Sequence, residues 1–244
     1  MRSQDGVGAE KQNKMALQKT KKEIASVAKA CKITDEIFSD IIGFFRFTTE
    51  RELMLYIRRE IKKRGLREAF PPIVSGGARA GNEIHPKSTD SVLEGFVIID
   101  FGVRINGYCS DMTRTIFVAN ENKRPSAKDR ALYKLVLASK EKSAKLAKPG
   151  AKCAAADAAA RKVLGVYKKY FIHTLGHGVG KRIHEKPRMY FKRTEDVFLE
   201  NMIVTVEPGI YIPGVLGIRI EDTYVVTKKG LQSLTKSPKS LIVI

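Results

Sequence analysis

Asp100 and Asp111 are the residues whose types and spacing point most directly to chemistry in this chain. Asp100 ends an apolar run that is typical of a strand, and the Asn106-Gly107 pair that follows predicts a type I′ hairpin turn. That turn would set Asp100 opposite Thr113 and Asp111 opposite Gly102, which leaves the space between the two carboxylates open. Carboxylates on such a diagonal lie about 7 Å apart. This separation suits two divalent cations about 3.5 to 4 Å from each other.

Histidines add nitrogen ligands to this prediction. Aspartates in a hairpin are also common as surface turn formers, but all four histidines fall in or beside motif-like segments: His85, His173, His177 and His184. Glycines at 176, 178 and 180 argue against a helix through the last three, because each costs up to about 1 kcal/mol there. We therefore expect an irregular strand, in which the even separation puts His173 and His177 on one face.

A second pair of carboxylates follows the histidines. Glu207 ends the apolar run 203–206, and Glu221 lies in a strand whose apolar residues alternate with Arg219 and Glu221. An exposed ion pair would explain Arg219 beside Glu221, but it does not explain a carboxylate directly after four apolar residues. Four carboxylates and one imidazole form a ligand set for a hard cation, with manganese, cobalt, iron and zinc as the candidates.

These three segments resemble a metallopeptidase family with the pita-bread fold, which contains the methionine aminopeptidases and the Xaa-Pro aminopeptidases and dipeptidases. The resemblance rests on Ile-Asp100-Phe-Gly with Gly-Tyr-Cys-Ser-Asp111-Met-Thr-Arg-Thr, then Gly-His177-Gly-Val-Gly with His184-Glu-Lys-Pro, then Val-Glu207-Pro-Gly with Arg219-Ile-Glu221-Asp. It covers nearly the whole chain. It implies two divalent metal ions, manganese or cobalt first and iron or zinc otherwise, held by five ligands: Asp100, Asp111, His177, Glu207 and Glu221.

The resemblance also implies how these ligands divide between the two ions. Asp111 and Glu221 would bridge the ions, Asp100 would bind one of them, and His177 with Glu207 would bind the other. Asp100 and its metal would remain free to bind the amine of a peptide substrate. The expected enzyme is therefore an exopeptidase that requires a free N-terminus.

Five side chains would carry the remaining steps of peptide hydrolysis. A water between the ions would have its pKa lowered toward neutrality, and Glu207 would carry its proton to the leaving nitrogen. By resemblance, His173 and His184 would hydrogen-bond the scissile carbonyl and the developing oxyanion. His85 would assist at the leaving side, and Arg219 would orient a neighbouring carboxylate.

The spacing of the last two glutamates separates the branches of the family. Glu207 and Glu221 are fourteen residues apart, a setting that resembles the Xaa-Pro peptidases. Methionine aminopeptidases usually carry a longer insertion between these two glutamates. We therefore expect an Xaa-Pro peptidase first and keep a methionine aminopeptidase as the alternative. We expect cleavage after an N-terminal residue that proline follows, by a monomer or a homodimer.

Helices flank the motifs in a repeated order. We expect helices over residues 15–32, 49–65, 126–149 and 152–164, since Thr49 with Glu52 forms a capping box and Ser126 is a favoured N-cap. Two helices precede a ligand-bearing hairpin in each half, which predicts internal pseudo-twofold symmetry. The resemblance implies an α+β pita-bread fold, a curved antiparallel sheet flanked by helices. We expect residues 15–244 to form one catalytic domain and residues 1–14 a flexible basic tail.

Composition sets the remaining expectations. No run approaches the about 20 apolar residues that a membrane span needs, and the three cysteines lack CxxC spacing, so we expect a cytoplasmic protein without membrane contact. The net charge of +19, from 45 Lys or Arg against 26 Asp or Glu, is not required by peptidase chemistry. Lysines on solvent-facing helix surfaces explain it most simply. The alternative of another class is a ribosome- or RNA-associated binding protein on a peptidase scaffold.

Overall fold

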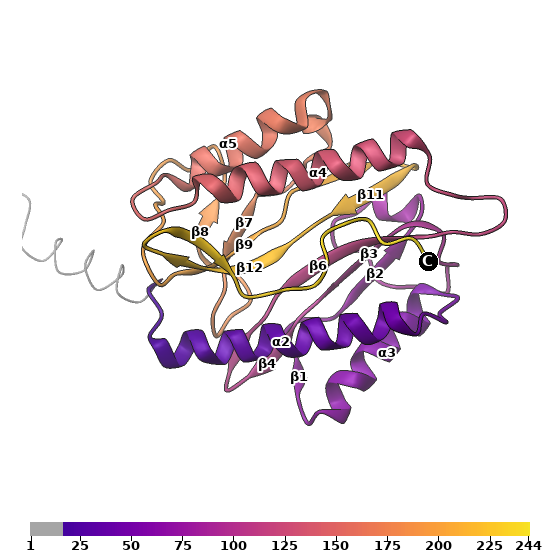
Figure 1. The fold of residues 1–244 in the computed structure, drawn as a ribbon, viewed down its shortest axis with the longest axis horizontal. Helices are drawn as coiled ribbons and strands as arrows, with labels where there is room; N and C mark the ends of the chain where they lie inside the picture. Colours follow the sequence, from indigo (N-terminus) through magenta and orange to yellow (C-terminus); the bar gives the residue numbers. More distant parts are fainter. Residues whose placement is uncertain (1–16) are drawn as a thin grey trace, which may run out of the picture.

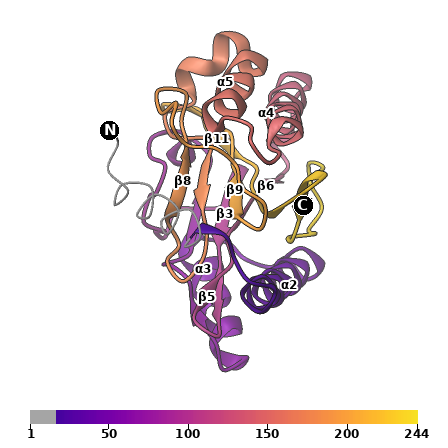
Figure 2. The ribbon, with the colours of Figure 1, turned by 90° about the vertical axis from the view of Figure 1, so that its left-hand side faces the viewer.

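Strands fill the space between two pairs of helices in the computed structural model, which describes residues 17–244 (Figure 1). The helices α2 and α3 span Lys21–Gly43 and Glu50–Lys63. The helices α4 and α5 span Ala127–Leu146 and Cys153–Leu164, and they lie on the opposite side of the strands (Figure 2). The predicted tail over residues 1–14 lies outside the described residues.

Capping boxes fix the starts of three helices. In each, the N-cap hydroxyl accepts a hydrogen bond from the backbone amide of the third helical residue. The acidic side chain of that third residue accepts one from the N-cap backbone amide. The pairs are Thr20 with Glu23, Thr49 with Glu52, and Ser126 with Asp129. The predicted starts of α3 and α4 are thereby confirmed. The predicted helix over Lys152 to Leu164 is also confirmed, with Lys152 as the N-cap.

The predicted helix over residues 15–32 is confirmed for residues 21–32, but both of its bounds differ in the described residues. Thr20 has extended backbone and caps a helix that begins at Lys21. The helix then continues to Gly43, because buried apolar residues keep the spacing of a helical face beyond residue 32: Ile37, Phe38 and Ile41.

The strands divide between the two halves of the chain. The first half holds β1 Arg67–Glu68, β2 Ile73–Gly76, β3 Gly95–Phe101, β4 Val103–Ile105, β5 Tyr108–Cys109 and β6 Met112–Val118. The second half holds β7 Gly176–Gly178, β8 Glu185–Met189, β9 Ile203–Val206, β10 Gly209–Ile212, β11 Leu216–Arg219, β12 Asp222–Thr227 and β13 Gly230–Ser233. Short 3₁₀ segments add η1 at Arg79–Gly81 and η2 at Gly165–Tyr170. All pairs of named strands are antiparallel, in the orders β2-β3-β6, β1-β4-β5, β10-β11 and β13-β12-β9-β7-β8.

The predicted hairpin register is confirmed at both of its ends. Asp100 on β3 pairs with Thr113 on β6, and Ile105 pairs with Tyr108 next to the turn. The turn residues Asn106 and Gly107 have φ values of 51° and 82°, as both central positions of a type I′ turn require.

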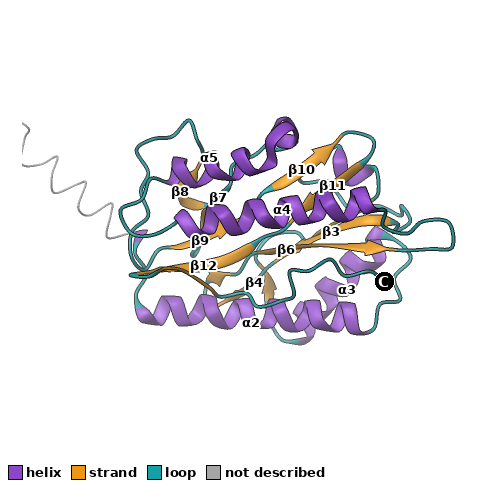
Figure 3. Ribbon diagram, turned by 45° about the horizontal axis from the view of Figure 1, so that its top comes forward, coloured by secondary structure: helices purple, strands orange, loops and turns teal. Residues whose placement is uncertain are grey.

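Hydrogen bonds between β6 and residues 219–221 join the two halves, whose strands are orange in Figure 3. The Thr115 hydroxyl accepts from the Arg219 amide at 3.0 Å and donates to the Arg219 carbonyl at 2.8 Å. The Glu221 amide donates to the Thr113 carbonyl at 3.0 Å. The ligand-bearing hairpins of the two halves therefore meet in the middle of the molecule, between the helix pairs.

Each helix pair packs on its own apolar core. The helices α2 and α3 cover a cluster that includes Ile99, Phe101 and Ile116, while α4 and α5 cover one that includes Val204 and Ile218. This repetition of helices, core and hairpin is the predicted pseudo-twofold arrangement. No helix among residues 17–244 combines the length and apolar character that a membrane crossing needs.

Candidate metal centre

The first two predicted ligands lie on the β3–β6 hairpin. Asp100 is the sixth residue of β3, and Asp111 directly precedes β6; they are 6% and 4% exposed. Gly102 lies between β3 and β4, and its role differs from the predicted one of leaving space between the carboxylates. A Cβ at this position would lie 1.9 Å from the Ser110 carbonyl oxygen. Glycine is needed for the close approach of two backbones, rather than to open space between the carboxylates.

Adjoining strands of the second half bring the other three ligands to the same place. His177 lies in the middle of β7, Glu207 directly follows β9, and Glu221 lies between β11 and β12. The strand β9 pairs with both β7 and β12. Pairing of these strands explains why residues up to 44 positions apart in the sequence become neighbours.

All five predicted ligands line one cavity of about 590 Å³. Asp111, His177 and Glu221 each offer an atom within 4.8 Å of the other two. The His177 Nε2 atom also lies 3.3 Å from a Glu207 oxygen. The structure thus brings Asp100, Asp111, His177, Glu207 and Glu221 together around a common space.

Among the described residues, not every carboxylate oxygen in this cavity has a hydrogen-bond partner, as expected for oxygens that bind a cation. The Asp100 Oδ1 and Glu221 Oε1 atoms are buried and have no partner among the described residues. A buried carboxylate oxygen without a partner is costly. The Nδ1–H group of His177 donates to the Gly178 carbonyl at 3.0 Å, which leaves Nε2 with a lone pair toward the carboxylates. Oxygen atoms and one imidazole nitrogen directed at one point suit a divalent metal.

The pKa values of these groups reflect crowding of negative charge. Burial raises the pKa of Asp111 and of Glu221 well above the usual range, and neighbouring carboxylates raise both further. Burial also raises the pKa of Glu207, yet the hydrogen bond and charge of His177 outweigh it and hold that pKa at about 2. Burial lowers the pKa of His177, and its bond with Glu207 more than reverses this. Without metal, the contact with Glu207 therefore favours the protonated form of His177.

Arg219 contacts Asp100 rather than the sequence neighbour Glu221. Its Nη2 atom donates to Asp100 Oδ2 at 2.6 Å, and its Nε donates to the Thr113 hydroxyl at 3.1 Å. Thr113 in turn donates to Glu221 at 2.6 Å. A second threonine, Thr205, donates to Glu207 at 3.1 Å. Asp100, Glu221 and Glu207 thereby each accept a hydrogen bond, from Arg219, Thr113 and Thr205 respectively.

The histidines divide into two groups. His85 and His184 line the cavity, and the ring of His184 meets that of His177 edge to face at 4.4 Å. His173 does not line it. Its Nδ1–H donates to the Thr174 carbonyl at 2.8 Å, so its Nε2 accepts from the Tyr211 hydroxyl at 2.9 Å. Tyr211 occupies the Nε2 atom of His173 here, and the contact of His173 with a scissile carbonyl stays a prediction.

Sequence reasoning missed Tyr211, Thr113 and Thr205. Tyr211 connects His173 to Arg219, because its hydroxyl accepts from Arg219 Nη1 at 2.6 Å. Thr113 could have been found, since the predicted register set it opposite Asp100. Thr205 could also have been found, since it lies two residues before Glu207 and so on the same face of the strand. For Tyr211 the sequence offered no such signal.

Comparisons with known proteins agree with this geometry. The chain matches the model of metallopeptidase family M24 over residues 25–228. It is 39% identical over 230 residues to an Xaa-Pro dipeptidase of Pyrococcus furiosus, covering 92% of this chain and 64% of that protein. It is 38% identical over 234 residues to an Xaa-Pro dipeptidase of Pyrococcus horikoshii, covering 93% and 65%. The chain spans a little under two thirds of the length of these relatives.

Solved structures extend the similarity to the fold. An Xaa-Pro dipeptidase from Bacillus anthracis matches with a TM-score of 0.88 and 40% identity, covering 95% of this chain and 65% of that one. An X-Pro aminopeptidase from Thermotoga maritima matches with a TM-score of 0.89 and 33% identity, covering 96% and 67%. The predicted resemblance and the predicted α+β pita-bread fold are confirmed. The chain belongs to metallopeptidase family M24.

Proposed function

We propose that this chain is a dinuclear-metal exopeptidase that releases the N-terminal residue from peptides with proline in the second position. One observation carries the proposal: five ligands of a hard cation line a single cavity, and two of their buried oxygens lack partners among residues 17–244. Membership of a metallopeptidase family implies divalent metal. The Xaa-Pro dipeptidases at 38–40% identity support proline specificity.

In this proposal five side chains would hold the two ions: Asp100, Asp111, His177, Glu207 and Glu221. When bound, two divalent cations supply a water of lowered pKa and polarise the scissile carbonyl. Manganese or cobalt is our first expectation for the metals, with iron or zinc as alternatives.

Glu207 is the proton carrier that we propose for the reaction. The Glu207 carboxylate lines the cavity, where we propose that it accepts the proton. The Thr205 hydroxyl at 3.1 Å holds one of its oxygens and leaves the other for this task. His184 and His85, on the cavity wall, are positioned to hydrogen-bond a bound carbonyl or leaving nitrogen.

Arg219 and His173 act through other residues in this scheme. Arg219 orients Asp100, and the Tyr211 hydroxyl fixes the plane of the Arg219 guanidinium. His173 accepts from that hydroxyl and thereby sets its direction. We therefore assign His173 a positioning role in place of the predicted contact with substrate.

Paired peptides test the proposal. The purified chain, loaded with manganese or cobalt, is given peptides that differ only in whether proline or alanine follows the N-terminal residue, with a Met-Ala-Ser series alongside. Cleavage confined to the proline peptides is the expected result. Cleavage of the methionine series would assign the protein to the other branch, and no cleavage with metal bound would favour the binding-protein alternative. A Glu221→Gln variant controls for a contaminating peptidase.

A further inference from the structure

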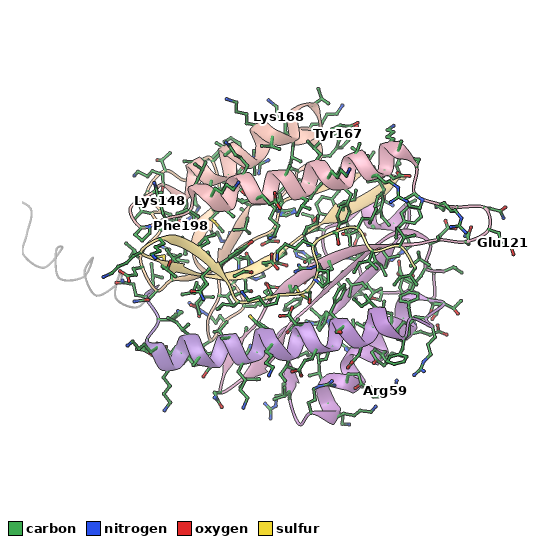
Figure 4. All side chains as sticks on the ribbon, viewed as in Figure 1. Arg59, Glu121, Lys148, Tyr167, Lys168 and Phe198 are labelled. Atoms are coloured by element: carbon green, nitrogen blue, oxygen red, sulfur yellow. The ribbon has the colours of Figure 1, made fainter. Side chains whose placement is uncertain are left out.

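About half of the net charge lies on one side of the molecule, the α4–α5 side, defined here as residues 126–172. Those 47 residues contain twelve Lys or Arg and three Asp or Glu, a net charge of +9 out of +19. Figure 4 shows Lys148, Tyr167 and Lys168 on this side and Arg59 on the other. None of the proposed peptidase residues belongs to it. The charge therefore calls for an explanation of its own.

The opposite helix pair provides an internal comparison. On the α2–α3 side, residues 20–64, eleven Lys or Arg stand against seven Asp or Glu. Six of those cations lie within 4.0 Å of a carboxylate: Lys32, Arg51, Arg58, Arg59, Lys63 and Arg64. On the α4–α5 side only Lys140 and Arg161 do so among the described residues. The two sides have similar lengths, but one is largely neutralised and the other is not.

The remaining ten cations of the α4–α5 side are all exposed: Lys128, Arg130, Lys134, Lys142, Lys145, Lys148, Lys152, Lys162, Lys168 and Lys169. They begin at the start of α4 and continue through η2. A helix of 20 residues such as α4 is about 30 Å long. Unpaired positive charge over such a length suits an extended polyanion better than a single small anion.

Aromatic rings lie next to cations at the η2 end of this side and at the neighbouring Phe191. Arg161 lies 4.9 Å and Lys192 lies 5.8 Å from the centre of the Phe191 ring, which is 41% exposed. Lys169 lies 5.0 Å from the centre of the Tyr170 ring. The basic run therefore does cluster with aromatic side chains here, although the sequence showed it only as spread along helices.

A hollow of about 500 Å³ lies between the Phe191 ring and the helix surface; it is lined by Ala158, Arg161, Lys162, Gly165, Lys168 and Phe191. Arg161 in this lining is held by hydrogen bonds. The guanidinium donates to Asp157 at 2.8 Å and to the carbonyls of Phe171 and His173, each at 2.7 Å. The hollow thus combines a held guanidinium, an aromatic ring and the exposed residues Lys162 and Lys168.

We propose that the α4–α5 side binds single-stranded nucleic acid. The exposed lysines would contact successive phosphates, and the hollow beside Phe191 would accept an unpaired base. Aromatic platforms next to a basic track are the features that bind single strands without sequence preference. The peptidase cavity lies elsewhere, so binding and hydrolysis can proceed together.

An anionic membrane is the rival partner, because Val166 and Ile172 are also exposed here, at 79% and 57%. Three observations favour nucleic acid instead. Cations extend along the whole of α4 rather than around the apolar residues only, Phe191 and Tyr170 are covered by cations, and a hollow lies beside Phe191.

Salt-dependent binding tests the phosphate contacts. Fluorescence anisotropy measures the affinity of the full chain for a labelled oligouridine of about 20 nucleotides between about 50 and 200 mM salt. Each phosphate contact contributes about −0.7 to the slope of log affinity against log salt. Replacement of Lys142, Lys145, Lys168 and Lys169 by glutamine should reduce the slope by up to about 2.8 and weaken binding about tenfold or more.

A matched variant keeps this test specific. Lys21, Lys22, Lys29 and Lys62 are exposed, lie on the α2–α3 side and have no carboxylate partner among the described residues. Their replacement by glutamine removes the same charge and should change the slope by less than about 0.7. Equal losses in the two variants would overturn the proposal, because binding would then follow overall charge alone. Both should retain wild-type peptidase activity.

Two further probes separate the partners. Phe191→Ala should weaken binding of the single strand about fivefold or more and leave a duplex of equal length unaffected, whereas Val215→Ala at another exposed apolar site should change neither. Vesicles of phosphatidylcholine with phosphatidylserine should bind more weakly than the oligonucleotide. Binding to those vesicles alone, or no binding to oligouridine at the lowest salt, would overturn the proposal.

Discussion

Replacement of Arg219 by methionine removes the cation that contacts Asp100. The two side chains are 1% and 6% exposed, and Nη2 lies 2.6 Å from Oδ2. Burial already raises the pKa of Asp100, and the charge and hydrogen bond of Arg219 oppose that rise. In Arg219→Met the pKa of Asp100 should therefore rise further, so that the metal-free protein binds a proton on this carboxyl more readily than the wild type does.

Loss of Arg219 should weaken metal binding for two reasons. A metal ion must displace the added proton, and Asp100 loses the group that fixes its direction. Removal of a group that orients a metal ligand typically costs about 10- to 100-fold in affinity, which is about 1.4 to 2.8 kcal/mol. The metal-free protein should also lose about 3 to 5 kcal/mol of unfolding free energy, as expected when one partner of a buried pair is removed.

Calorimetric titration with manganese measures the change in metal affinity and the change in proton release. Titrations in two buffers of different ionisation enthalpy give the affinity and the number of protons released. We expect Arg219→Met to bind more weakly and to release about one more proton than the wild type. Arg219→Lys should lie between them, because it keeps the charge but loses the planar fork. Arg59→Met, at a half-exposed surface residue, serves as the control.

Wild-type affinity and proton release in Arg219→Met would refute this reasoning, since Arg219 would then have no influence on Asp100. A fall in unfolding free energy with unchanged metal affinity would assign Arg219 a purely structural role. Urea unfolding of the metal-free variants separates these two outcomes.

Three further predictions address the ligands, the positioning histidine and pH. Glu221→Gln or Asp111→Asn should abolish hydrolysis of Xaa-Pro peptides with an unchanged circular dichroism spectrum, and normal turnover by either would exclude the two-metal proposal. His173→Ala should lower turnover far more than metal content, since His173 contacts Tyr211 behind the cavity; loss of metal would instead make it a ligand. Tyr108→Phe should lower the unfolding free energy by about 1 to 2 kcal/mol near neutral pH, because the Tyr108 hydroxyl donates to Glu23 at 2.6 Å. That bond is the largest cause that lowers the pKa of Glu23 from 4.5 to about 2, with Thr20 hydrogen bonds contributing, and the largest cause that raises the pKa of Tyr108 from 10.0 to about 12, with burial contributing. The stabilisation should therefore be lost as pH falls from 4.5 through 2 and as it rises from 10 through 12; urea unfolding that shows a pH-independent difference would contradict this.

Local signals in the sequence predicted much of the fold. The Asn106-Gly107 pair fixed a register that the structure reproduces, because a type I′ turn leaves few alternatives for the strands beside it. The start of α2 was missed, although Thr20 and Glu23 form the same capping box that was recognised at Thr49. The prediction relied on the apolar spacing of that helix and overlooked Thr20 as its N-cap.

Contacts between distant segments could not be predicted in the same way. Arg219 alternates with Glu221 along the chain, which suggested that the two side chains pair. The structure pairs Arg219 with Asp100 instead, 119 residues away. Sequence alternation shows which side chains share a face, but the partner depends on which strand of the other half lies opposite. The role of Tyr211 was invisible for the same reason.

Charge balance argues for two ions rather than one. With all groups ionised, the four carboxylates and Arg219 sum to −3, and His177 is neutral as a ligand. One divalent cation leaves −1, whereas two cations with one hydroxide leave zero. Uncompensated charge in a buried cavity is costly, and in the metal-free site burial and the neighbouring carboxylates raise the pKa values of Asp111 and Glu221, which favours proton uptake there. A site with a single ion should still hold a proton, and the second ion should release it on binding.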